Sequence, residues 1–201
     1  MQSFIKSGIM RLKFLPMGLL IFPLCLGALY GVGVAQTVTM EPGAVKSAKP
    51  PLKSPRGSAD VTLDGKKITV DYGRPFMRGR KIMGGLVPYG TVWRTGANAA
   101  TSLVTETDIT VEGMAVPKGS YTLFTLPSEN GWKLIISKQT GQWGTDYDQT
   151  KDFARIDMKK EKLNATLDQF TISFDKKSED NAALNFDWEN TRLSVKIAVK
   201  K

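Results

Sequence analysis

The sequence predicts an all-β domain, an antiparallel β-sandwich of jelly-roll type with roughly nine strands, and three observations support this fold class. Short segments alternate apolar and polar residues with the period of two that is typical of a half-buried strand. Turn signals such as Asp64-Gly65 and Pro117-Lys118-Gly119 separate these segments. No segment shows a convincing helical period. The alternation indicates that each sheet buries one face and exposes the other.

The predicted strands follow one another from Ser58 to the end of the chain. Ile68, Val70 and Tyr72 share the face of an early strand that we expect to be buried, and alternation favours a core position for Trp132 and Trp188. The segments that carry the pattern are residues 60–63, 67–72, 100–106, 108–111, 114–116, 121–126, 132–138, 153–160, 166–175, 181–188 and 192–199.

Residues 1–35 have the features of a signal peptide. A basic start without acidic residues precedes an apolar run over residues 14–32, and small residues lead up to a predicted cut after Ala35. The protein is therefore expected to be secreted or periplasmic, with no stable membrane span after cleavage. An uncleaved membrane anchor is one alternative, since the run approaches the length of a bilayer span. A lipoprotein attached at Cys25, the sole cysteine, is the other.

A flexible linker and one folded domain follow the signal peptide. Residues 36–57 are rich in Pro, Lys and Ala and are typical of a linker, whereas residues 58–201 form a single all-β domain. The chain after Ala35 contains no cysteine, so it has no disulfides and depends on its apolar core for stability. We expect a monomer.

Composition excludes several chemistries. The chain contains no histidine, which excludes Ser-His-Asp and Cys-His nucleophilic sites and His-ligated zinc. Seven of the 28 basic residues but one of the 19 acidic residues precede Ser58, so the domain has a net charge near +3 and nucleic-acid binding is not expected. Asp146, Asp148 and Asp152 do not match the twelve-residue calcium loop. We expect no metal and no cofactor.

Residues 71–98, the central loop, are the stretch most suggestive of function. They combine many Gly, Pro and aromatic residues with basic side chains, a composition typical of an ordered loop rather than a linker. Its guanidinium groups are suited to bidentate recognition of a carboxylate, a phosphate or a sugar acid. The alternative is internal pairing with Asp71, Glu106 and Asp108. The basic candidates are Arg74, Arg78, Lys81 and Arg94, with Arg80 between them.

Aromatic and polar candidates surround these cations. Residues 139–152, the Trp143 loop, form a second irregular stretch, and Trp143 lies there among polar residues and glycine, which favours a ligand-facing indole. Asn98 is suited to a turn with a left-handed backbone, or to a ligand hydrogen bond. The remaining candidates are Tyr89, Trp93, Glu106 and Tyr147.

The central loop also carries a family resemblance. Its motifs are Arg74-Pro75, Arg78-Gly79-Arg80-Lys81-Ile82, Gly84-Gly85-Leu86-Val87-Pro88-Tyr89-Gly90 and Val92-Trp93-Arg94-Thr95-Gly96-Ala97-Asn98. Together with Pro117-x-Gly119-x-Tyr121, Gln142-Trp143-Gly144 and Tyr147-Asp148, they resemble the domain-of-unknown-function family 2911 over about residues 54–199. The resemblance implies an exported bacterial β-domain with no established activity, and it supplies no catalytic residues.

These observations favour a non-catalytic domain that binds an extracellular small molecule or glycan where the two loops meet. One alternative is a glycan-acting hydrolase that uses carboxylates such as Glu106 or Asp148. The other is a cell-envelope module for protein interaction, for which an exposed apolar patch would be the mark. Whether any reaction is catalysed is left open.

Overall fold

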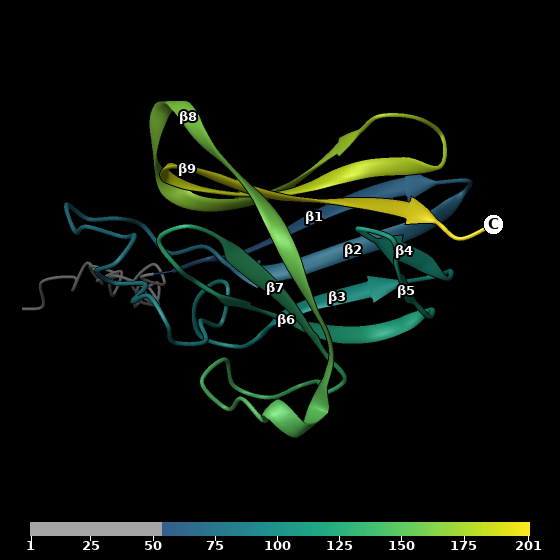
Figure 1. The fold of residues 1–201 in the computed structure, drawn as a ribbon, viewed down its shortest axis with the longest axis horizontal. Coiled ribbons are helices and arrows are strands. Elements are labelled where there is room, and N and C mark those ends of the chain that lie inside the picture. The colour runs from purple at the N-terminus through teal and green to yellow at the C-terminus, as the bar shows by residue number, and fades with distance from the viewer. Residues whose placement is uncertain (1–53) are drawn as a thin grey trace, which may run out of the picture. The chain divides into compact units, whose positions relative to one another are not determined.

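The computed structural model describes residues 54–201 and shows an all-β domain with nine strands, as the alternating pattern predicts (Figure 1). The predicted signal peptide and the linker up to residue 53 lie outside the described residues. The strands are β1 (Arg56–Leu63), β2 (Lys66–Gly73), β3 (Thr101–Thr105), β4 (Ile109–Val111), β5 (Met114–Val116), β6 (Gly119–Leu126), β7 (Trp132–Ser137), β8 (Asp152–Lys176) and β9 (Asn181–Val199). Between residues 54 and 201 the single helical element is a 3-10 turn, η1 (Gln149–Lys151), and no helix there is long and apolar enough to cross a membrane.

All nine strands belong to one antiparallel sheet with the order β1-β2-β3-β6-β7-β8-β9-β4-β5. The sheet bends over itself, so that β1 contacts both β8 and β9, and the β8–β9 ribbon crosses the first strands in Figure 1. A backbone hydrogen bond of 2.8 Å from Asp64 N to Glu179 O ties the β1–β2 turn to the β8–β9 turn. The two layers of the predicted sandwich are therefore two parts of a single curved sheet.

The sequence predicts four separate strands at the C-terminal end, and in the structure they are joined in pairs into two long, bent strands. β8 joins residues 153–160 to 166–175, and β9 joins residues 181–188 to 192–199. Their pairing shifts register between Lys162 and Leu167 and again between Leu167 and Thr171, which bends the ribbon at this point. Glu189, opposite Leu167, has a left-handed backbone with φ 53°. The interruptions in the sequence pattern are therefore bends within strands rather than loops between them.

The main core lies between the two layers of the bent sheet. Ile68, Val70 and Tyr72 are buried on one face of β2, as their alternation predicts. The indoles of Trp132 and Trp188 are each 1% exposed, which confirms their expected core positions. Burial of these aromatic groups supplies much of the apolar area that a domain without disulfides requires.

β6 and β7 depart from the expected pattern because they are buried on both faces. Leu123 and Ile136 face the main core, whereas the cross-strand pair Phe124 and Ile135 lies on the opposite face and is also buried. The ring of Tyr147 packs on Phe124 with centroids 4.9 Å apart. The Trp143 loop therefore covers the outer face of the sheet here, and this second, smaller core holds it in place.

Candidate functional site

The central loop and the Trp143 loop pair with each other. An isolated antiparallel bridge joins Ala99 to Trp143, and Gly144 N donates a 3.0 Å hydrogen bond to Asn98 O. Ala100 N donates to Gln142 O at 3.3 Å. Two irregular segments more than 40 residues apart in the sequence thus form one structure, as the sequence analysis expected.

Strand β6 fixes the part of the central loop that carries Arg94. Trp93 and Thr125 exchange backbone hydrogen bonds of 2.8 and 2.9 Å, and Thr95 Oγ1 lies 3.2 Å from Thr125 Oγ1. The indole of Trp93 stacks on that of Trp188, with centroids 5.8 Å apart, and contacts Phe170 edge to face. Because Trp93 points into the core and Thr95 is fully buried, Arg94 between them is held in a defined position.

Gly144 permits the closest approach between the two loops. A Cβ atom at this position would lie 2.6 Å from Asn98 O and 2.7 Å from Arg94 Cδ. Only a residue without a side chain leaves room for the Arg94 side chain to run along the Trp143 loop at this distance. The glycine in the Gln-Trp-Gly motif is therefore explained by packing against Arg94.

Tyr147 anchors the Trp143 loop through a polar network. Its hydroxyl donates to Asp152 Oδ2 at 2.6 Å and accepts from Arg155 Nη2 at 2.7 Å, while Arg155 Nε donates to Asp152 Oδ2 at 2.9 Å. Burial, together with the hydrogen bond and charge of Asp152, raises the pKa of Tyr147 to about 12. The phenol is therefore neutral at every physiological pH and acts as a fixed donor to Asp152.

Two hollows adjoin Arg94, one on each side. The first, of about 180 Å³, lies between the loops and is lined by Val92, Phe124, Gly144, Thr145 and Tyr147 in addition to Trp93 and Arg94. The second, of about 270 Å³, is lined by Arg94 together with Arg80, Leu86 and Asn98. We call the pair the Arg94 site. Neither hollow is lined by an acidic residue.

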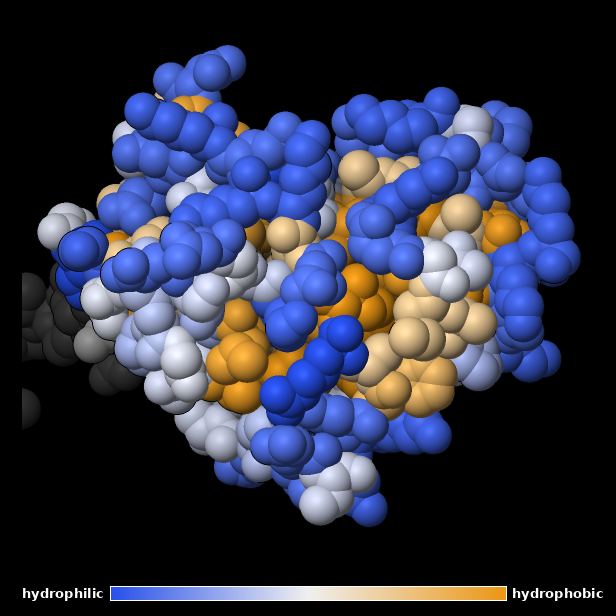
Figure 2. Space-filling view, viewed as in Figure 1, coloured by the Kyte–Doolittle hydropathy of each residue, from blue (hydrophilic) through white to orange (hydrophobic). Residues whose placement is uncertain are grey.

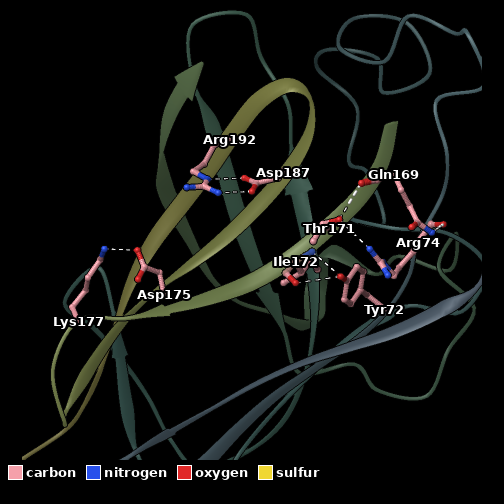
Figure 3. Close-up of polar contacts among 9 residues, drawn as sticks. All are labelled: Tyr72, Arg74, Gln169, Thr171, Ile172, Asp175, Lys177, Asp187 and Arg192. Atoms are coloured by element: carbon pink, nitrogen blue, oxygen red, sulfur yellow. Dashed lines mark hydrogen bonds and ion pairs between the residues drawn. The ribbon is translucent and has the colours of Figure 1, made fainter. Parts of the chain in front are cut away.

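The arginines of the central loop differ in what they contact. Arg74 donates to Phe170 O and to Thr171 Oγ1, at 3.5 and 3.1 Å, and Arg80 donates to Met77 O and Phe76 O at 2.9 and 2.8 Å (Figure 3 shows Arg74). In contrast, the guanidinium of Arg94 makes no hydrogen bond or ion pair with any residue from 54 to 201. Of these three groups, Arg94 is the one that lines a hollow without making a hydrogen bond or ion pair within residues 54–201.

The carboxylates considered as internal partners are engaged elsewhere. Asp71 pairs with Arg56, Glu106 accepts from Lys67 N at 2.7 Å, and Asp108 accepts from Lys118 N at 2.8 Å. Glu106 follows the far end of β3, whereas the central loop enters at its start, so a strand of five residues separates it from the Arg94 site. Asp148 caps η1 by accepting from Thr150 N at 2.9 Å and Thr150 Oγ1 at 2.7 Å, and these bonds lower its pKa.

The other predicted site residues occupy varied positions. Trp143 is 53% exposed, which makes it the most exposed large apolar side chain between residues 54 and 201. Asn98 has a left-handed backbone, φ 65°, and its amide donates to Ser54 O at 3.4 Å. Tyr89 is half-buried against Gly84, and Lys81 is exposed. Arg78 has a left-handed backbone with φ 52°.

Sequence reasoning missed several residues that line the two hollows, among them Phe124, Gly144 and Thr145. Gly144 was visible as part of a motif, but its contact with Arg94 requires the fold. Phe124 occurs in an ordinary strand pattern, and no local signal marks its outer face as covered. Within residues 54–201 no group of three acidic, His or Cys side chains could hold a metal ion.

Comparison with known proteins gives a family but no activity. The family described as "Protein of unknown function (DUF2911)" matches residues 54–197. No curated protein and no solved structure matches the chain.

Proposed function

The chain belongs to the DUF2911 family, whose description assigns no activity, and we propose that it is an exported, monomeric, non-catalytic domain that binds an extracellular small molecule or glycan at the Arg94 site. The ligand group that this site recognises is a carboxylate, as in a sugar acid or a small organic acid. The signal peptide predicted over residues 1–35 supports the extracellular assignment.

One observation carries the proposal: Arg94 lines both hollows, and its guanidinium donates no hydrogen bond to any residue in the described part of the chain. A guanidinium offers five N–H donors in a planar fork, and a carboxylate matches two of them. The absence of acidic residues from both linings leaves the site with a positive charge. An anionic ligand would supply the acceptor that the fold does not.

The site is also held ready for a ligand. Trp93 and Thr95 fix the backbone on either side of Arg94, and Gly144 supports its aliphatic stem. Such pre-organisation lowers the entropy that binding must overcome. Trp143, which precedes Gly144, lines neither hollow, and its exposed indole offers a flat apolar face suited to packing against a sugar ring.

Ligand binding is tested by thermal unfolding of the full chain with succinate, glucuronate and galacturonate. A ligand that binds only the folded state raises the melting temperature by mass action. At a free ligand concentration of a hundred times Kd, it adds about 2.7 kcal/mol to the free energy of unfolding. We expect a saturable increase with at least one of these acids. Arg94→Ala should remove it, and Arg94→Lys should weaken it because an ammonium group lacks the planar fork.

Lys66→Ala is the matched control, since it also removes one positive charge but lies at the exposed β1–β2 turn. The increase should be the same in this variant as in the natural sequence. The proposal is wrong if none of the acids shifts the melting temperature, or if Arg94→Ala and Lys66→Ala reduce the shift equally.

A second candidate function, protein interaction, has one observation in its favour. An open groove of about 580 Å³ separates the β4–β5 turn from β8 and is lined by Met114, Ala115, Arg155 and Ile156. Met114 is half exposed, and Figure 2 shows apolar surface gathered around a hydrophilic strip on this face. The two candidates depend on different residues, so Met114→Asp should disturb protein docking and leave carboxylate binding at Arg94 unchanged.

A further inference from the structure

A second hollow lies on the outer face of the β8–β9 ribbon, away from the Arg94 site. The ribbon has two arms: residues 159–162 pair with 191–194 in one, and residues 171–176 pair with 182–187 in the other. Side chains directly opposite each other on paired strands point to the same face. Leu184, Phe186 and Leu193 face the core, so the residues between them form the outer face.

The bend of the ribbon folds this outer face into a crease. Arg192 on the first arm donates to both carboxylate oxygens of Asp187 on the second, at 2.8 and 2.6 Å, and closes the bend (Figure 3). A hollow of about 350 Å³ opens beside this ion pair, between the arms and the β4–β5 turn. We call it the Asn185 crease.

Asn185 is the residue of this hollow whose side-chain amide has no hydrogen-bond partner in the described part of the chain. It lines the crease, is 4% exposed, and its side-chain amide makes no hydrogen bond with any residue between 54 and 201. A primary amide has two donors and an acceptor oxygen with two lone pairs, and the amide atoms of Asn185 are not among the sealed, unpartnered polar atoms of residues 54–201, so they are open to the hollow. The hollow is much larger than one water molecule, whose share of liquid volume is about 30 Å³. These features indicate a site with room for a ligand that completes the amide's hydrogen bonds.

The charges of the crease are balanced, unlike those of the Arg94 site. Lys159 pairs with Glu161 at 2.9 Å. Lys177 pairs with Asp175, and Arg192 pairs with Asp187, as Figure 3 shows. Glu112 and Lys196, one carboxylate and one ammonium group, complete the charged lining. Each ammonium group nevertheless keeps unused donors and each carboxylate keeps unused lone pairs, so the hollow around the amide offers both donors and acceptors.

We propose that the Asn185 crease is a second binding site, which takes a small neutral polyhydroxyl compound such as a monosaccharide or a cyclic polyol. A hydroxyl group donates and accepts at the same time, so neighbouring hydroxyls are suited to a wall that offers both donors and acceptors. Asn185 donates to one hydroxyl and accepts from the next. The proposal is independent of ligand binding at Arg94.

Nuclear magnetic resonance of the ¹⁵N-labelled full chain tests the site directly. Myo-inositol, glucose and galactose are titrated in turn, and the side-chain amide signals of Asn185 are assigned by their loss in Asn185→Leu. We expect at least one of the three compounds to shift these signals saturably. The Arg192 Nε–H signal should shift with them because it borders the same hollow.

Asn185→Leu separates a binding role from a structural one. The substitution replaces an amide that has no hydrogen-bond partner within residues 54–201 with an apolar group of similar size, so the melting temperature should change little. The half-saturation concentration for the same compound, followed through Arg192 Nε–H, should increase about tenfold or more because two hydrogen bonds are lost. A structural role alone would lower the melting temperature instead.

Two control variants make the outcome specific. Ser173→Ala alters the same face of the ribbon outside the hollow, and Arg94→Ala disables the other site; both should bind the polyol as the natural sequence does. Asn185→Leu should in turn leave succinate binding unchanged. The proposal is overturned if none of the three compounds shifts the Asn185 signals at a ligand concentration of 100 mM, which is on the order of the Kd of a very weak site. It is also overturned if Asn185→Leu binds the compound as tightly as the natural sequence does.

Discussion

Arg94 and Arg192 both border a polar hollow, but the fold uses them in opposite ways. Arg192 donates through Nε and Nη2 to both carboxylate oxygens of Asp187, a residue only 6% exposed, across the bend of the β8–β9 ribbon. Arg94 is held by its stem against Gly144 and lines two hollows that contain no carboxylate. Internal pairing makes the first arginine part of the fold and leaves its hollow neutral. Lack of pairing leaves the second hollow positive.

Arginines that are paired within this domain can be distinguished from those that are not. The density of basic residues in the sequence is no guide, since Arg74 and Arg80 lie in the same loop as Arg94 and donate to neighbouring carbonyl or hydroxyl oxygens. What matters is whether the fold supplies an acceptor. Substitutions should therefore separate stability from binding at these positions.

The largest expected effect is on stability, at the closed pair. Arg192→Ala leaves the buried carboxylate of Asp187 without its partner, which should lower the free energy of unfolding by about 3 kcal/mol. The loss is smaller than for a fully buried pair because the Arg192 side chain reaches solvent. Urea unfolding measures it. A change below 1 kcal/mol, expected of an exposed ion pair, would show that Arg192 does not hold the bend.

A smaller effect is expected where the two loops touch. Gly144→Ala places a methyl group against Asn98 O and the Arg94 stem, which should lower the free energy of unfolding by about 2 kcal/mol and weaken carboxylate binding. Gly131→Ala is the control, because a Cβ there meets no atom within 4 Å. Equal stability of the two variants in urea unfolding would argue against the close contact at Gly144.

Alkaline pH should act on the anchor of the Trp143 loop. The pKa of Tyr147 is raised from 10.0 to about 12 in the folded state, so folding favours its protonated form. The resulting stabilisation is complete below pH 10 and is lost as the pH rises towards 12. Stability measured by urea unfolding from pH 9 to 12 should therefore fall more steeply for the natural sequence than for Tyr147→Phe. Parallel curves would contradict the assignment.

The strand pattern predicted the fold class well, because alternation reports burial directly. Ile68, Val70 and Trp132 are buried as expected. The single curved sheet was not predictable, because a bend within a strand and a loop between strands interrupt the pattern in the same way. The covered outer face at Phe124 was not predictable either, since it depends on a loop that comes later in the sequence.

The candidate site was predicted in part. Sequence reasoning found the two loops, and the structure brings Arg94, Tyr147 and Trp143 into one region. It also proposed Glu106, which the antiparallel pairing of β2 and β3 places at the far end of the strand. Asn185 was not noticed, because an outward-facing position on a strand gives no sign that the ribbon folds over it.

The smallest effect on stability should accompany the largest effect on binding. Arg94→Ala removes no hydrogen bond or ion pair within residues 54–201, so the free energy of unfolding should change by less than about 0.5 kcal/mol. Loss of a bidentate contact to a carboxylate should weaken binding by about thirtyfold, since hydrogen bonds to charged groups contribute about 1.5–3 kcal/mol.

Isothermal titration of succinate and glucuronate into the natural sequence and Arg94→Ala tests this claim most directly. We expect saturable binding of at least one acid by the natural sequence and a loss of about thirtyfold or more in the folded Arg94→Ala variant. If both proteins bind the acid equally, or if neither acid binds the natural sequence, Arg94 does not form a carboxylate site.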